Sequence, residues 1–264
     1  IHDENFKGQY ILSLYEDHEK TIWIGTNAGL YKYKNGKITA EEQVNKLNAD
    51  GFEFAIYSIV EDKHGNMWIG TANGLIKLEN NHITIFNEKN NFISSTVLAS
   101  TIDDQKNLWF GTGGGLFNYD YKSFTKISQK NGLSSNNVLA LQTDNNQRLI
   151  LSLNTGVDIL NLNDYYNHKI NVQHFGKDDG LLNLESNYNA SFKDKDGRIL
   201  IGTISGLEIY DPAYDEKNSK EAITNINSIK LFFGQEDILK YSKGIDTIST
   251  LPLNLELPFN KNHI

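Results

Sequence analysis

The feature that most constrains this chain is a short segment that recurs five times. Each copy has an apolar or aromatic pair, then a small residue, and a glycine four positions after that residue. The copies read TIWIGTNAGLYKY (21–33), NMWIGTANGLIKL (66–78), NLWFGTGGGLFNY (107–119), RLILSLNTGVDIL (148–160) and RILIGTISGLEIY (198–210). The position of the first tryptophan falls at Trp23, Trp68, Trp109, Ile150 and Leu200, which gives spacings of 45, 41, 41 and 50 residues. Such periods, with enough residues for four strands each, are typical of β-propeller blades.

The alternation of apolar and polar residues divides each unit into four strands. In the second unit the expected inner strand is YSIVED (57–62), followed by NMWIGT (66–71), GLIKLE (74–79) and the outer strand HITIFN (82–87). Turns such as DKHGN (62–66) separate the first two strands, because aspartate, glycine and asparagine favour turns. The best helical segment, residues 40–47, is short and is expected to be a connection. The predicted fold is all-β, with five recognisable four-stranded blades.

The run Gly113-Gly114-Gly115 resembles a phosphate-binding loop at first sight. The aligned copies instead place it in the hairpin between the second and third strands, where only the last glycine recurs, as a position with positive φ requires. A dinucleotide fingerprint is excluded because Leu116 stands where a third glycine is needed. The run is therefore predicted to be a turn.

The tryptophan and glycine positions of the repeat are predicted to be structural. On the second strand, Trp68 and Gly70 share one face, so the glycine lets a neighbouring blade approach while the ring fills the space beside it. The full set is Trp23, Gly25, Gly29, Trp68, Gly70, Gly74, Trp109, Gly111, Gly115, Gly156, Gly202 and Gly206.

Composition narrows the classes of partner. The 264 residues carry 25 Lys+Arg against 33 Asp+Glu, a net charge of −8, so nucleic acid is not an expected partner. The absence of cysteine excludes thiolate catalysis, cysteine-based zinc sites and disulfides. No apolar run approaches the roughly 20 residues of a spanning helix, and the N-terminus lacks a signal-peptide pattern. Any membrane anchor or export signal is expected to lie outside this chain.

Residues 131–160 and 179–212 resemble the regulator-propeller repeat of two-component systems. That repeat has a Gly-Leu segment before the inner strand, an Asp-x-x-Gly turn, and Trp-Ile-Gly-Thr-x-x-Gly-Leu, and the resemblance covers residues 8–212. The fourth copy departs from the pattern at Ile150, Ser152 and Leu153 but keeps Gly156. Propellers of this family usually have seven blades, so the resemblance implies that the five copies are part of a larger ring. A closed five-bladed ring is the alternative.

The pattern changes after residue 212. Residues 222–238 and 251–264 resemble the opening strands of the triple-tyrosine β-sandwich that follows the last blade in the same family. The expected domains are propeller blades over 1–212, with repeats near 10–50, 54–90, 97–130, 138–175 and 189–212, and a link with a truncated sandwich over 213–264.

The resemblance implies a function in sensing. Such propellers form the extracytoplasmic, periplasmic sensor of a histidine kinase or hybrid two-component system, often for oligosaccharides. The implied partners are an oligosaccharide and a second copy bound through the sandwich, and this fragment itself is not expected to be an enzyme. A propeller lyase or hydrolase, and a protein-interaction scaffold, are the alternatives.

The sequence predicts no catalytic residues, no metal site and no cofactor. The seven histidines form no His-x-His or His-x-x-x-His pair, and His168 and His174 are expected to be solvated near an outer strand. The adjacent carboxylates Asp103 and Asp104 are expected in a turn, exposed to solvent. A Gly-x-Ser-x-Gly nucleophile motif is absent.

A ligand is expected at the face where the loops entering the inner strands meet the hairpins between second and third strands. Short amides and hydroxyls there suit the hydroxyls of a neutral carbohydrate. The candidate residues are Asn27, Asn73, Asn136, Asn137, Asn154, Glu185, Asn187, Tyr188 and Ser205, with Asn189 beside them. Five aromatics could stack on sugar rings, although strand aromatics more often belong to the blade core: Tyr57, Tyr121, Phe124, Tyr188 and Phe192.

Overall fold

The structure is a computed structural model that describes residues 10–49, 55–87, 92, 96–183, 185–214, 237–246 and 251–258. The chain divides into two compact units, Ile1–Asp215 and Glu216–Ile264. In the first unit, five antiparallel sheets follow one another in chain order, one for each sequence repeat.

The bounds of the strands follow the expected repeat. The first two sheets contain β1 (Ile11–Glu16), β2 (Ile22–Thr26), β3 (Leu30–Lys34) and β4 (Lys37–Ala40), then β5 (Ile56–Glu61), β6 (Met67–Thr71), β7 (Gly74–Glu79) and β8 (His82–Phe86). The next two contain β9 (Val97–Ile102), β10 (Leu108–Thr112), β11 (Gly115–Tyr119) and β12 (Phe124–Ile127), then β13 (Val138–Thr143), β14 (Arg148–Leu153), β15 (Gly156–Asn161) and β16 (Val172–Phe175). The fifth sheet contains β17 (Ser186–Lys193), β18 (Ile199–Thr203) and β19 (Gly206–Tyr210).

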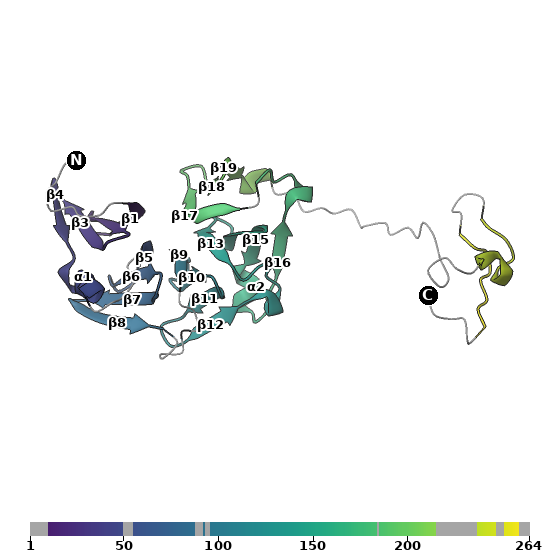
Figure 1. The fold of residues 1–264 in the computed structure, drawn as a ribbon, viewed down its shortest axis with the longest axis horizontal. Helices are drawn as coiled ribbons and strands as arrows, with labels where there is room; N and C mark the ends of the chain where they lie inside the picture. The colour runs from purple at the N-terminus through teal and green to yellow at the C-terminus, as the bar shows by residue number, and fades with distance from the viewer. Residues whose placement is uncertain are drawn as a thin grey trace. The chain divides into compact units, whose positions relative to one another are not determined.

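The sheets are arranged as blades of a propeller. Figure 1 shows the inner strands β5, β9, β13 and β17 toward the inside of the arc and the outer strands β4, β8, β12 and β16 toward its periphery. Over the described residues, four blades have four strands and the fifth has three. The all-β propeller prediction is confirmed, while the fourth strand expected in the last blade is not found among these residues.

In the described part of the chain, two α-helices interrupt the β pattern. Residues 40–47 were expected to be a plain connection, but α1 (Glu42–Ala49) forms between β4 and β5. Its Asn45 side chain accepts a hydrogen bond from Leu30 N at 2.7 Å and donates one to Leu30 O at 3.0 Å. A helix this short depends on such tertiary contacts, which the sequence pattern does not reveal. The second helix, α2 (Leu162–Tyr166), lies between β15 and β16.

The glycines of the second strands allow the next blade to approach closely. A Cβ atom added to Gly70 would lie 2.8 Å from Val97 Cγ1 and 2.9 Å from Val97 O, which belong to the third blade. Gly25 and Gly111 meet Ile56 and Val138 of their following blades in the same way. The predicted close approach of neighbouring blades at this position is confirmed.

The turn aspartate of each blade accepts a hydrogen bond from a side chain at or near the start of the second strand. In the first three blades its Oδ2 accepts a hydrogen bond from the tryptophan Nε1, as Asp62 does from Trp68 at 2.9 Å. The last two blades have Ile150 and Leu200 at the tryptophan position, and an arginine two positions earlier is the donor instead: Arg148 Nε donates to Asp144 and Arg198 Nε donates to Asp194, both at 2.7 Å. Two residue types, tryptophan and arginine, therefore donate a side-chain hydrogen bond to the turn carboxylate.

The glycine run is a hairpin tip, as predicted. Thr112 Oγ1 donates to Gly115 O at 2.7 Å and accepts from Gly114 N at 3.0 Å, and Gly115 has φ of 131°. The same threonine bridge recurs in the first, second and fifth blades. The run is thus part of the blade and not a phosphate cradle.

The second unit is described only in part. A 3-10 turn covers Ile238–Tyr241, and one isolated bridge joins Ile245 to Pro252. The sandwich strand expected at 222–238 falls almost wholly outside the described residues, and no strand occurs in the described parts of 251–264. The triple-tyrosine sandwich remains a prediction.

Candidate functional site

As expected, the loops that lead into the inner strands and the hairpins between the second and third strands meet at one face. Ala72 N donates to Ala55 O at 3.1 Å in the second blade, and Ile204 N donates to Glu185 O at 3.2 Å in the fifth. We call this side of the propeller the hairpin face. Its loops carry seven of the nine predicted ligand residues, while Asn187 and Tyr188 lie within β17 (Ser186–Lys193).

Four of the predicted asparagines brace this face. Asn27 Oδ1 accepts from Tyr10 N at 3.0 Å, Asn136 Oδ1 from Gln129 N at 2.9 Å, and Asn154 Oδ1 from Ser135 Oγ at 2.6 Å. Asn187 Nδ2 donates to Thr203 O at 3.1 Å. Their ligand-binding role stays a prediction, because each has at least one polar group engaged in holding a loop.

The other five predicted residues differ in exposure. Asn73 and Asn137 are half-buried, whereas Glu185, Tyr188 and Ser205 are exposed. Tyr188 makes an edge-to-face contact with Tyr57 of the second blade, with ring centroids 5.5 Å apart. It is the one predicted ligand residue that forms such a ring contact among the described residues.

The position of Tyr188 results from a widened bulge in β17. The first four inner strands each have a one-residue register irregularity at the same place, as between Ile56 and Ser58. In β17, Ser186 pairs with Thr203 and Ser191 with Ile201, so four residues lie opposite Gly202. Bulges of this kind re-aim side chains.

A central cavity lies between the inner strands. Its volume is about 580 Å³, and residues of β1, β5, β9, β13 and β17 line it. The lining includes Asn189, with φ of 52°, and Phe192, which is 64% exposed. Glu16 is the only charged residue that lines the described part of the cavity, and it pairs with Lys20 at 2.7 Å.

Sequence reasoning missed both the bulge and the cavity. A signal existed: the loop glycine precedes the turn aspartate by twelve positions in the fourth repeat (Gly132, Asp144) and by fourteen in the fifth (Gly180, Asp194). The two additional residues are accommodated in the bulge of β17.

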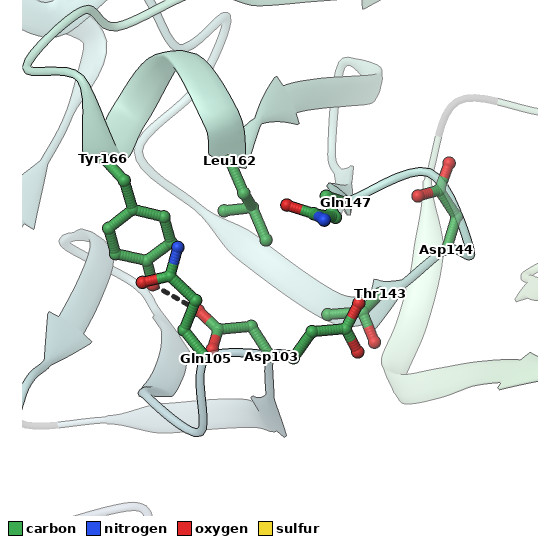
Figure 2. Close-up of a pocket in the computed structure, with 8 residues that line it drawn as sticks. Asp103, Gln105, Thr143, Asp144, Gln147, Leu162 and Tyr166 are labelled. Carbon is green, nitrogen blue, oxygen red and sulfur yellow. Dashed lines mark hydrogen bonds between the residues drawn. The ribbon is translucent and has the colours of Figure 1, made fainter.

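On the face opposite the hairpin face, a hydrogen bond between Tyr166 and Asp103 joins the third and fourth blades. Figure 2 shows Tyr166 of α2 reaching Asp103, whose Oδ2 accepts a hydrogen bond from the Tyr166 hydroxyl. Asp103 is buried and also accepts from Trp109 Nε1 at 2.7 Å, so its predicted exposure to solvent is wrong. Burial, together with this hydrogen bond to Asp103, raises the pKa of the Tyr166 hydroxyl. The adjacent cavity of about 10 Å³ has room for one water and not for a larger ligand.

Two histidines form pairs with carboxylates. Glu61 accepts from His18 across the first two blades, and this hydrogen bond raises the pKa of the His18 imidazole. His174 is exposed, as expected, and its Nδ1 contacts the buried Asp158 at 2.7 Å. Across the described residues, no three His, Cys, Asp or Glu side chains gather as metal ligands would.

These features define a β-propeller with a braced hairpin face and a central cavity. The family model described as "Two component regulator propeller" matches residues 5–28 and 55–73, which belong to the first two repeats. No curated protein is similar enough to count as a match. None of the helices in the described ranges has the length and apolar character needed to cross a membrane.

Solved structures share this fold. The extracellular domain of a protein from B. thetaiotaomicron, assigned as a hybrid two component system, has a TM-score of 0.65 and 22% identity, and the match covers 84% of this chain and 33% of that one. A second extracellular domain from B. thetaiotaomicron, assigned to a one component system, has a TM-score of 0.60 and 22% identity, and the match covers 79% of this chain and 28% of that one. Virginiamycin B lyase from Staphylococcus aureus has a TM-score of 0.57 and 14% identity, and the match covers 80% of this chain and 72% of that one. This chain therefore spans about a third or less of each of these two extracellular domains.

Proposed function

We propose that this chain is part of the extracytoplasmic ligand-sensing region of a two-component sensor histidine kinase or hybrid regulator. The observation that carries the proposal is the match of the first two repeats to the regulator-propeller model. The fold shared with two extracellular domains supports it. The proposed ligand is an oligosaccharide, and the triple-tyrosine sandwich would follow the propeller and contact a second copy.

Sensing would work through a shift in packing. A ligand that binds one arrangement of propeller and sandwich more tightly than another biases the kinase by the difference in affinity. A neutral oligosaccharide at 100 times its Kd should stabilise the protein by about 2.7 kcal/mol, seen as a higher Tm of the full-length protein. The same ligand should change autophosphorylation. An oligosaccharide panel that moves neither quantity contradicts the proposed function.

We also propose that further blades complete the ring. The leucine that follows the hairpin glycine is fully buried in blades that have a following blade, as at Leu75 and Leu116, because the following blade covers it. In the last described blade its equivalent Leu207 is 58% exposed, and a Cβ added to Gly202 would meet only Ala190 of the same blade. On the first blade, Ile11, the counterpart of Ile56, Val97 and Val138, is 55% exposed. The fifth blade thus has open space beside Gly202 that the inner strand of a following blade would occupy. On the first blade, Ile11 would pack against the glycine of a preceding blade.

Gly202→Ala tests this completion. In the present chain the substitution should change the free energy of unfolding by about 0.5 kcal/mol or less, since only Ala190 lies near. In a longer version of the protein it should cost about 1–3 kcal/mol, because a following inner strand would occupy the notch. Urea unfolding of both versions measures the difference. Equal small effects in both would contradict a blade seated against this face.

A further inference from the structure

The widened bulge of β17 places aromatic and amide groups beside the central cavity. Tyr188 lies in the bulge against Tyr57, and the next residue, Asn189, lines the cavity. Asn189 adopts a left-handed backbone conformation, which asparagine tolerates better than most residues. An irregular, partly strained segment that presents exposed side chains at a cavity is a recurring feature of binding sites.

The chemistry of the cavity points to a neutral, hydroxyl-rich ligand. Among the lining side chains, the hydroxyls of Ser13 and Ser191 donate to Ile56 O and Leu141 O, and the Ser100 hydroxyl is buried. The polar groups that remain are the Thr101 hydroxyl and the amides of Gln142 and Asn189, which come from three inner strands. These groups can both donate and accept hydrogen bonds, as sugar hydroxyls do. The single charged residue is Glu16, already paired with Lys20, so the described lining has no set of cations that would favour an acidic ligand.

The exposed aromatic rings supply the apolar part of such a site. Tyr188 is 54% exposed although its edge-to-face partner Tyr57 holds it in place, and Phe192 is exposed within the cavity lining. A ring fixed by another ring presents apolar area at a low cost in side-chain entropy. The cavity volume of about 580 Å³ lies within the range of small-ligand sites.

We propose that the β17 bulge and the adjacent cavity bind the end of a neutral oligosaccharide. Tyr188 packs against the apolar face of one sugar ring, and Asn189 hydrogen-bonds to its hydroxyls. This inference rests on the proposed sensing function and adds the residues and the charge class of the ligand. It also moves the binding determinants from the braced hairpin asparagines to the bulge and the cavity.

The experiment measures binding of neutral gluco-, manno- and xylo-oligosaccharides to the full chain by calorimetry, with oligogalacturonides as the acidic comparison. Tyr188→Ala should weaken binding of the best neutral ligand about tenfold or more, while Tyr188→Phe should keep it within about threefold. Asn189→Gly keeps the left-handed backbone accessible and removes the amide side chain, so it should weaken binding about tenfold without a change in Tm. Tyr214→Ala, which removes an exposed tyrosine that lines a separate cavity beside β19, is the matched control and should bind normally.

Each other outcome has a definite meaning. Neutral binding that survives both Tyr188→Ala and Asn189→Gly overturns this site but leaves the sensing function intact. Tighter binding of oligogalacturonides than of neutral sugars overturns the neutral-ligand assignment. No binding by any panel member overturns this inference, and unchanged kinase output with the same panel also removes the proposed function.

Discussion

Gly70→Ala is expected to lower the free energy of unfolding by about 3 kcal/mol. The added Cβ would lie 2.8 Å from Val97 Cγ1 and 2.9 Å from Val97 O. The Ser58 hydroxyl of the same blade, which would lie nearest to this Cβ, and the Val97 side chain could both rotate away. The Val97 carbonyl belongs to the backbone of β9 and can move only with the third blade. The substitution therefore forces two blades apart and exposes part of the cluster formed by Trp68, Leu75 and Phe110.

Urea unfolding measures this effect, with Gly113→Ala as the matched control. Gly113 lies at a hairpin tip, where an added Cβ would have Asn137 Oδ1 at 4.0 Å as its nearest neighbour. Its substitution should change stability by about 0.5 kcal/mol or less. Equal effects at the two glycines would show that close approach of the blades is not what Gly70 provides.

Asp103→Ala is expected to cost about 3–5 kcal/mol of stability. The buried carboxylate accepts from Asn107 N at 3.0 Å, from Trp109 Nε1 at 2.7 Å and from the Tyr166 hydroxyl. Alanine leaves the indole N–H and the hydroxyl without their acceptor inside the junction of the third and fourth blades. Each donor then keeps its desolvation cost without the compensating bond.

Two variants separate the contributions at this site. Tyr166→Phe removes the hydroxyl that donates to Asp103 and accepts from Asn107 Nδ2 at 2.9 Å, and it should cost about 1–2 kcal/mol, because Trp109 Nε1 and Asn107 N keep Asp103 as their acceptor. Asp103→Asn keeps a side-chain oxygen and should fall between the other two variants. Denaturant unfolding followed by tryptophan fluorescence gives all three values. A loss below about 1 kcal/mol for Asp103→Ala would contradict a structural role for the carboxylate.

The propeller could be predicted because its blades repeat. Trp68 and Gly70 recur at fixed offsets, so each copy supports the strand register of the others, and the periodic Asp-x-x-Gly turns fix which ends of the strands share a face. The positive φ of Gly115 followed from the same comparison, since only that glycine of the run recurs. These properties depend on local geometry, which the sequence pattern records directly.

The candidate site was harder to predict because it depends on contacts between blades. Tyr188 was singled out as a ligand residue, but its partner Tyr57 lies three blades earlier in the chain. Asparagines such as Asn27 and Asn154 fit a sugar site by composition, and the structure shows them bracing loops. A side chain that can bind a ligand can equally satisfy a neighbouring backbone group, and composition does not distinguish the two uses.

The sequence by itself determined the blade repeat, the turn positions and the absence of cysteine chemistry. Only the tertiary structure decided that Asp103 is buried under Tyr166, that Arg148 replaces a tryptophan as the partner of a turn aspartate, and that β17 bulges beside the central cavity. The physical reason is the range of the interactions involved. Strand alternation and turn conformations act over a few residues, whereas burial, buried hydrogen bonds and cavities arise where segments distant in sequence pack together.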